Sequence, residues 1–230
     1  MSAGKYVLQA NRRRRNGDLD GALTDYEEAL RIDPEYARAY TGRGNVRWNQ
    51  GDLEGALADY EEALRLNPKS ASAYTGRGNV RYRQGALEGA LTDYEKALHI
   101  DPEYASAYLG RGYVRSAQGD LERALTDYEK ALHIDPEYAS AYTGRGYVRC
   151  RQGDLEGALT DYEEALRIDP KYPLPYLKRG DIYRMKNELE KAIGDYQRYL
   201  NLGGGKRYGD REEVEQLIRD LKTRLDKQQS

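Results

Sequence analysis

The strongest constraint on this chain is an internal repeat. The segment AYTGRGNV begins at residue 39, and close copies begin at residues 73, 107 and 141, so successive copies are 34 residues apart. A fixed period of this length is typical of a solenoid, in which each unit buries its apolar face only against neighbouring units. The repeat therefore predicts a chain built from similar modules rather than around one irregular core.

Each unit carries the start and stop signals of two helices. Gly51 is placed where a first helix would end in a left-handed residue, and Asp52 follows as a helix N-cap. The second helix is predicted to stop before Asn67 and Pro68. The same signals recur at Gly85, Gly119 and Gly153, with asparagine at Asn187. We predict two helices of about a dozen residues in each unit.

These signals divide the chain into six units and a terminal segment. The predicted units span residues 3–36, 37–70, 71–104, 105–138, 139–172 and 173–206, which together form a solenoid over 3–206. Residues 207–230 no longer follow the repeat. Within them Asp210 and Glu213 are typical of a capping box, and Val214, Ile218 and Leu221 belong to one apolar stripe. We expect this helix to cover the open end of the last unit.

The spacing of aromatic, small and proline residues resembles the tetratricopeptide repeat family. The residues that carry the likeness in the second unit are Tyr40, Gly44, Ala56, Tyr60, Ala63 and Pro68. The resemblance implies an all-α, right-handed superhelical solenoid of helix-turn-helix repeats with a C-terminal capping helix. It also implies a non-catalytic scaffold that binds a peptide of a partner protein in a concave groove formed by the first helices. Arg43 and Arg47 depart from the family's usual leucine and tyrosine.

Composition narrows the possible partners. The chain has 230 residues and a net charge of -2, which gives no general reason to expect nucleic acid or an anionic membrane. No apolar stretch is long enough to predict a membrane span, and no export signal is recognised. Cys150 is the single cysteine, so an internal disulfide is excluded. We expect a cytoplasmic protein.

One side of the first helices changes from unit to unit while the other side stays nearly constant. On a helical wheel, the variable positions form a narrow stripe. The predicted peptide-binding residues on this stripe are Arg38, Thr41, Asn45, Trp48, Asn49, Thr75, Asn79, Tyr82, Arg83, Leu109, Tyr113, Thr143, Tyr147, Cys150, Arg151, Leu177, Asp181 and Arg184.

This stripe is open to two interpretations. It is either solvent-facing surface that drifts freely or a groove that holds a ligand. Its aromatic residues favour the groove, because an idle exposed face would be mostly charged. Four arginines make the stripe basic, with Asp181 as the exception. The predicted partner segment is therefore extended or helical, with acidic and apolar or aromatic side chains. The family's C-terminal carboxylate clamp is not expected, because Thr41 and Gly76 replace its lysine and one of its asparagines.

The repeated arginines and glycines favour packing over chemistry. Buried arginines need partners, and the second helices offer aspartates such as Asp59 and glutamates such as Glu61. In the last unit Tyr183 and Gln197 replace arginine and glutamate together. That joint change favours pairing of Arg47, Arg81, Arg115 and Arg149 with Glu61, Glu95, Glu129 and Glu163. The glycines at 42, 76, 110 and 144 either widen the groove or are tolerated at a helix edge.

No constellation of catalytic residues emerges, so we expect no enzyme activity, no cofactor and no metal. The Gly-x-Gly pairs and GGGK at 203–206 lack the spacing of phosphate-binding loops. His99 and His133 are expected on the surface, and Cys150 is read as a small groove residue rather than a reactive thiol. Two alternatives stay open beside the scaffold. One is a single-stranded RNA reader, against which the near-neutral charge argues, and the other is a self-assembling or engineered repeat protein that stacks end to end.

Overall fold

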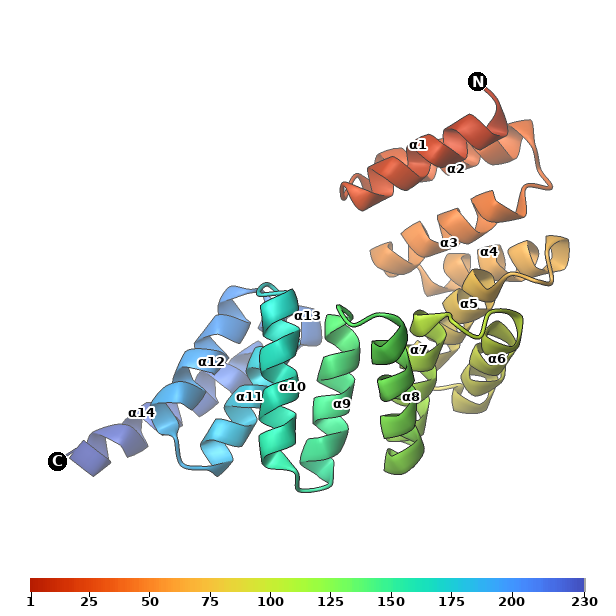
Figure 1. Ribbon diagram of the computed structural model, residues 1–230. Helices are drawn as coiled ribbons and strands as arrows, with labels where there is room; N and C mark the ends of the chain where they lie inside the picture. The colour runs from red at the N-terminus through yellow and green to blue at the C-terminus, as the bar shows by residue number, and fades with distance from the viewer. Residues whose placement is uncertain (230) are drawn as a thin grey trace. The chain divides into compact units, whose positions relative to one another are not determined.

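The computed structural model describes residues 1–229. Within this range the chain is helical and contains no strand, which confirms the predicted all-α class (Figure 1). In order, the helices are α1 (Ala3–Arg15), α2 (Leu19–Ile32), α3 (Ala37–Gln50), α4 (Leu53–Leu66), α5 (Ala71–Arg83), α6 (Leu87–Ile100), α7 (Ala105–Ala117), α8 (Leu121–Ile134), α9 (Ala139–Arg151), α10 (Leu155–Ile168), α11 (Pro173–Met185), α12 (Leu189–Asn201), α13 (Gly204–Tyr208) and α14 (Arg211–Gln229). No helix within 1–229 combines the length and apolar character that crossing a bilayer requires.

The chain divides into two compact units, residues 1–114 and residues 115 onward, with the boundary inside α7. In the first unit the helices pack in consecutive pairs, α1 with α2, α3 with α4, and α5 with α6 (Figure 1). In the second unit α9 packs with α10 and α11 with α12, and each pair also contacts the next. The tandem helix-turn-helix arrangement predicted from the repeat is confirmed within each unit.

The predicted helix boundaries rest on local hydrogen bonds and backbone angles. The Asp52 carboxylate accepts a hydrogen bond from the backbone N–H of Gly55 at 2.9 Å, and thus caps α4. Gly51 has φ +85°, a left-handed conformation that ends α3 without a Cβ penalty. Asn187 takes the same role after α11, with φ +59°. The predicted helix start and stop signals are therefore confirmed at these positions.

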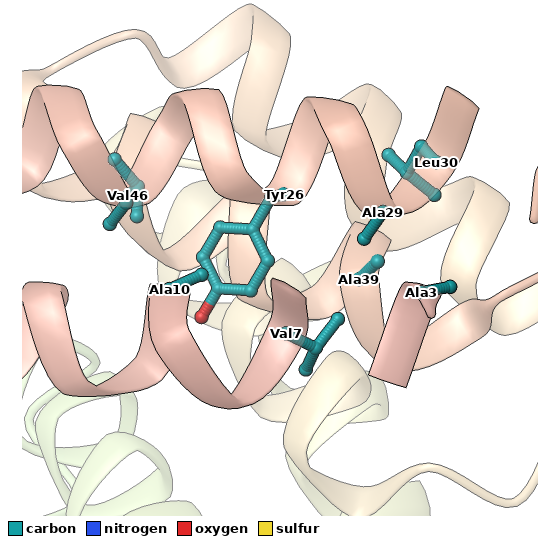
Figure 2. Close-up of a cluster of buried hydrophobic side chains, with 9 residues drawn as sticks. Ala3, Val7, Ala10, Tyr26, Ala29, Leu30, Ala39 and Val46 are labelled. Carbon is teal, nitrogen blue, oxygen red and sulfur yellow. The ribbon is translucent and has the colours of Figure 1, made fainter. Parts of the chain in front are cut away.

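A tyrosine from each second helix forms the centre of the core. In the first repeat, Tyr26 is fully buried among alanine and valine side chains of α1, α2 and α3 (Figure 2). Its counterparts are equally buried: Tyr60, Tyr94, Tyr128, Tyr162 and Tyr196 are each at most 1% exposed. Because the surrounding residues are small, one large ring fills the space between three helices.

These tyrosines explain the paired glycines of the first helices. A Cβ on Gly44 would lie 2.9 Å from the ring of Tyr60 in its own repeat, and a Cβ on Gly76 would lie 2.5 Å from the same ring. The ring is therefore held between two glycines, one from its own repeat and one from the next. The interpretation of Gly42, Gly76, Gly110 and Gly144 as merely tolerated at a helix edge was wrong, because a Cβ at each glycine would strike a buried tyrosine.

The terminal segment folds back onto the last repeat. Val214, Ile218 and Leu221 of α14 pack with Tyr199 of α12 in one apolar cluster. The glycines that precede α14 permit this turn: Gly203 has φ +79°, and a Cβ on Gly205 would lie 2.8 Å from the Cα of Arg211. A steric requirement thus accounts for the glycines of GGGK.

Candidate binding site on the first helices

The predicted stripe residues differ widely in exposure. The exposed ones are Arg38, Asn49, Arg83, Tyr147, Arg151 and Arg184. The half-buried ones are Thr41, Asn45, Trp48, Asn79, Tyr82, Tyr113, Cys150, Leu177 and Asp181. Ligand contact with these residues stays a prediction, but their exposure is compatible with it.

Three predicted residues are wrong as members of an offered surface. Thr75, Leu109 and Thr143 are only 4%, 8% and 3% exposed. Each directly precedes a glycine that packs on a buried tyrosine, so it lies at the edge of the interface between repeats. Thr143 also donates its hydroxyl hydrogen to the Ala139 carbonyl at 2.9 Å, within its own helix. These side chains support the stripe from below and do not face a ligand.

The stripe asparagines are held by the core tyrosines. The Tyr60 hydroxyl donates to the side-chain oxygen of Asn45 at 2.8 Å, and the Tyr94 hydroxyl donates to that of Asn79 at 2.7 Å. Tyr26 donates to Asn11 in the same way at 2.9 Å. Since the oxygen of each amide faces its tyrosine, the NH₂ group points the other way, along the side of the first helices that carries the stripe. The first unit thus presents three oriented amide donors on α1, α3 and α5.

Asn11 was missed by the sequence reasoning. It stands 34 residues before Asn45, so the repeat itself was the available signal. Asn11 is also the first residue of the basic run NRRRR at residues 11–15.

A pocket of about 580 Å³ lies beside two of these donors, Asn11 and Asn45, in the first unit. Asn11, Arg38, Thr41 and Asn45 line it, together with Leu8, whose side chain is 72% exposed. Both polar donors and apolar surface are therefore available along one wall. This size falls within the range of ligand sites, which are typically about 300–1,000 Å³.

The aromatic residues of the stripe are partly engaged with one another. The rings of Tyr82 and Tyr113 stack with centroids 6.3 Å apart and an angle of 15° between their planes. The Arg83 guanidinium lies over the Trp48 ring at 5.2 Å. Because Trp48 also packs against the apolar cluster around Tyr60, it is half-buried and positioned by the core. The rings are thus fixed rather than freely rotating.

A second, smaller pocket of about 270 Å³ lies in the second unit, between α9 and α11. Tyr147, Cys150 and Arg151 line it from α9, and Lys178, Asp181, Arg184 and Met185 line it from α11. Burial raises the pKa of the Cys150 thiol, which favours the neutral form over the reactive thiolate. The pocket thus combines apolar surface with three cationic side chains, those of Arg151, Lys178 and Arg184.

The arginines of the constant face pair with aspartates, so the predicted pairing with glutamates was wrong. Asp59 of α4 accepts from Arg43 at 2.7 Å and from Arg47 at 2.8 Å. Glu61 lies two residues further along, which is more than half a helical turn away, and it is exposed. The same bridging aspartates are Asp93, Asp127 and Asp161, whereas Glu95, Glu129 and Glu163 are exposed.

This pairing satisfies the arginines within the core. The hydrogen bonds that Arg77 donates to Asp93, together with the negative charge of Asp93, raise the pKa of Arg77 above its ordinary value. Arg77 also lies over the ring of Tyr74 at 5.4 Å. Arginines of the constant face are thus structural, whereas those of the stripe are exposed and lack a close ion pair within the described part of the chain.

The two histidines and the acidic residues do not gather into a cluster typical of a catalytic or metal site within residues 1–229. His99 and His133 are exposed on second helices. Within residues 1–229, no three side chains of histidine, cysteine, aspartate or glutamate converge into a group that could hold a metal ion.

Comparison with known proteins places this geometry in a family. Models described as tetratricopeptide repeat match residues 41–105 and 93–126, and a model described as TPR repeat matches residues 10–51, 112–153 and 146–186. A search of curated proteins found no significant match.

Several solved structures are similar. YrrB, described as a TPR protein with an unusual peptide-binding site, is 26% identical, with 74% of this chain and 88% of YrrB covered and a TM-score of 0.53. MamA is also 26% identical, with 70% of this chain and 95% of MamA covered and a TM-score of 0.56. TTC0263, a thermophilic TPR protein from Thermus thermophilus, is 23% identical, with coverages of 79% and 98% and a TM-score of 0.69. At that identity the last likeness shows the fold alone.

Proposed function

We propose that this chain, which belongs to the tetratricopeptide repeat family, is a non-catalytic scaffold that binds an extended segment of a partner protein along its first helices. Proteins of this family generally mediate protein–protein interactions, and the similar protein YrrB is described as having a peptide-binding site. Binding of the peptide on the stripe itself is inferred from the residues of this chain.

The observation that carries the proposal is the set of oriented amides on Asn11, Asn45 and Asn79. Each side-chain oxygen is occupied by a buried tyrosine hydroxyl, which leaves the NH₂ group to donate toward the stripe. An extended peptide offers backbone carbonyls at regular intervals, and those carbonyls need donors. Asn11 and Asn45 line the pocket of about 580 Å³, so a backbone there can reach them.

Charge and aromatic content support a partner segment with acidic and apolar side chains. Arg38 and Arg83 are exposed on the stripe of the first unit, and Leu8 lines the same pocket as Arg38 and offers an apolar contact there. Arginine binds carboxylates in a bidentate manner, which suits acidic side chains. The single cysteine suits a reducing compartment and supports a cytoplasmic location.

The two alternative functions find less support. An RNA reader is typically rich in positive charge, whereas this chain has a net charge of -2 and Arg43 and Arg47 are held by Asp59. End-to-end stacking needs open repeat faces. The α1 positions that correspond to the buried Ala39, Gly42 and Val46 carry Lys5, Leu8 and Arg12, and α14 covers α12 at the other end.

A peptide selection tests the proposal. The purified chain is used to select binders from a random peptide library, and affinities of the selected peptides are measured by fluorescence anisotropy. In Asn45→Asp with Asn79→Asp, each carboxylate still accepts from its tyrosine, as Asp181 does from Tyr196 at 2.8 Å, but the amide donors are lost. We expect affinity to fall about tenfold, since each lost hydrogen bond contributes roughly 0.5–1.5 kcal/mol.

The matched control adds the same charge away from the stripe. Gln84→Glu with Gln118→Glu changes two exposed side chains in the turns after α5 and α7, and should leave affinity unchanged. Equal loss in both double variants would contradict the proposal. Binding of labelled single-stranded RNA that weakens steeply with salt, without any selected peptide, would favour the RNA alternative.

A further inference from the structure

The pocket of the second unit differs from the rest of the stripe because the last repeat changes three residues. Lys178 stands where the second to fifth repeats have a packing glycine, as at Gly144. Asp181 replaces the asparagine or tyrosine found at this position in the second to fifth repeats, and Arg184 replaces a tryptophan, tyrosine, serine or cysteine. All three side chains line the pocket of about 270 Å³. The site thus gains charge where the second to fifth repeats carry none.

Its cations form only long ion pairs with the protein, although Arg184 also donates to the Tyr196 hydroxyl at 3.3 Å. The Lys178 ammonium and the Arg184 guanidinium lie 3.8 and 4.0 Å from Asp181, at the outer limit of an ion pair. The buried arginines of the constant face lie 2.6–2.9 Å from their aspartates, so these two cations are far looser. Arg151 adds a third positive charge and contacts the Tyr147 hydroxyl at 3.3 Å. One carboxylate therefore faces three cations.

A tyrosine hydroxyl that faces the same pocket lacks an acceptor within residues 1–229. The Tyr162 side chain is 1% exposed and lines the pocket, yet its hydroxyl has no hydrogen-bond partner among the described residues. Tyr26, Tyr60, Tyr94 and Tyr196 all donate at this point, to Asn11, Asn45, Asn79 and Asp181. In this repeat Tyr147 stands at the acceptor's position. A donor that faces a pocket lined with charged side chains, without a partner there, points to an acceptor supplied from outside.

We propose that this pocket binds the carboxylate side chain of an aspartate or glutamate in the partner segment. The inference rests on the proposed peptide-binding function and names one anchor of the peptide. One carboxylate oxygen accepts from the Tyr162 hydroxyl, and Lys178, Arg184 and Arg151 surround the negative charge. The volume, just below that of sites for whole small molecules, suits a single side chain.

Cys150 provides a test that needs no peptide. It lines the pocket and is the chain's single cysteine, so its reaction with disulfide reagents reports on this site alone. Rates are measured with dithiobis(nitrobenzoate), which carries two carboxylates, and with neutral dithiodipyridine. The ratio of the two rates cancels the intrinsic reactivity of the thiol and leaves the pocket's preference for an anion.

Two variants should move this ratio in opposite directions. Lys178→Gly, which restores the residue of the preceding repeats, should lower it about threefold, and Asp181→Asn should raise it about threefold, as expected for one charge a few ångströms away in a hydrated site. Asparagine keeps an acceptor for Tyr196, as Asn45 does for Tyr60. Lys171→Gln, which removes an exposed charge in the turn before α11, should leave the ratio unchanged.

The outcome separates this inference from the proposed function. If neither Lys178→Gly nor Asp181→Asn moves the ratio, the proposal that this pocket binds a carboxylate is refuted. Peptide binding at Asn45 and Asn79 is decided separately, by its own test. For a selected peptide with an essential glutamate, replacement by glutamine should weaken binding to the native chain about tenfold and to Lys178→Gly much less. Equal weakening in both proteins would also overturn the inference.

Discussion

Gly144 offers a direct test of why glycines flank each arginine of the first helices. A Cβ at this position would lie 2.6 and 2.7 Å from ring carbons of Tyr128, which is 1% exposed and has no room to move. Overpacking of this kind costs about 1–3 kcal/mol, whereas alanine gains about 1 kcal/mol over glycine in a helix interior. We expect Gly144→Ala to lower the free energy of unfolding by about 1 kcal/mol.

The chain contains a matched control. Gly194 is the sixth residue of the 13-residue helix α12, as Gly144 is of the 13-residue helix α9, but nothing lies within 4 Å of a Cβ at Gly194. Gly194→Ala should therefore stabilise the chain by up to about 1 kcal/mol, so the two variants differ by about 2 kcal/mol.

Urea unfolding followed by circular dichroism measures the difference. The penalty of Gly144→Ala should shrink in a Tyr128→Leu background, because the ring that it strikes is gone. If Gly144→Ala stabilises the chain as much as Gly194→Ala does, the steric account of these glycines is wrong.

Two further predictions concern the buried polar groups. Asp93→Asn leaves Arg77 and Arg81 without their shared carboxylate and should lower the free energy of unfolding in urea by about 3 kcal/mol. The control Glu95→Gln, on the exposed face, should change it little. Similar losses in the two variants would contradict the aspartate bridge. Burial raises the pKa of Tyr94, so the folded state keeps this phenol neutral above about pH 10, where the unfolded chain ionises it. Stability is thus full below about pH 10 and falls as the pH rises, by about 1.4 kcal/mol per pH unit for each such tyrosine. A urea midpoint that stays constant into this alkaline range would refute this reasoning.

Much of the fold could be predicted because its determinants are local. The left-handed positions at Gly51 and Asn187 and the cap at Asp52 act within a few residues of the chain, so their sequence signals are complete. The repeat then multiplies each signal. The stripe was also visible in the sequence, because comparison among the units separates varying positions from constant ones.

Other features depended on contacts that no local signal reveals. The glycines at 42 and 76 pack against tyrosines of the preceding repeat. Thr75 precedes Gly76 in the same contact between repeats and is buried there. The arginine pairing was mistaken because one joint substitution at Tyr183 and Gln197 was given more weight than helical periodicity. Asp59 lies three residues after the buried Ala56 and therefore faces the core, a signal that was available in the sequence.

The central claim, that the amides of the stripe bind a partner's backbone, is tested most directly by nuclear magnetic resonance. Side-chain amide signals of Asn45 and Asn79 are followed while a selected peptide is added, with the exposed Asn201 of α12 as the internal control. We predict that the Asn45 and Asn79 signals shift in proportion to peptide bound, while the Asn201 signal stays in place. A peptide that binds without moving the signals of Asn45 and Asn79 would contradict the account.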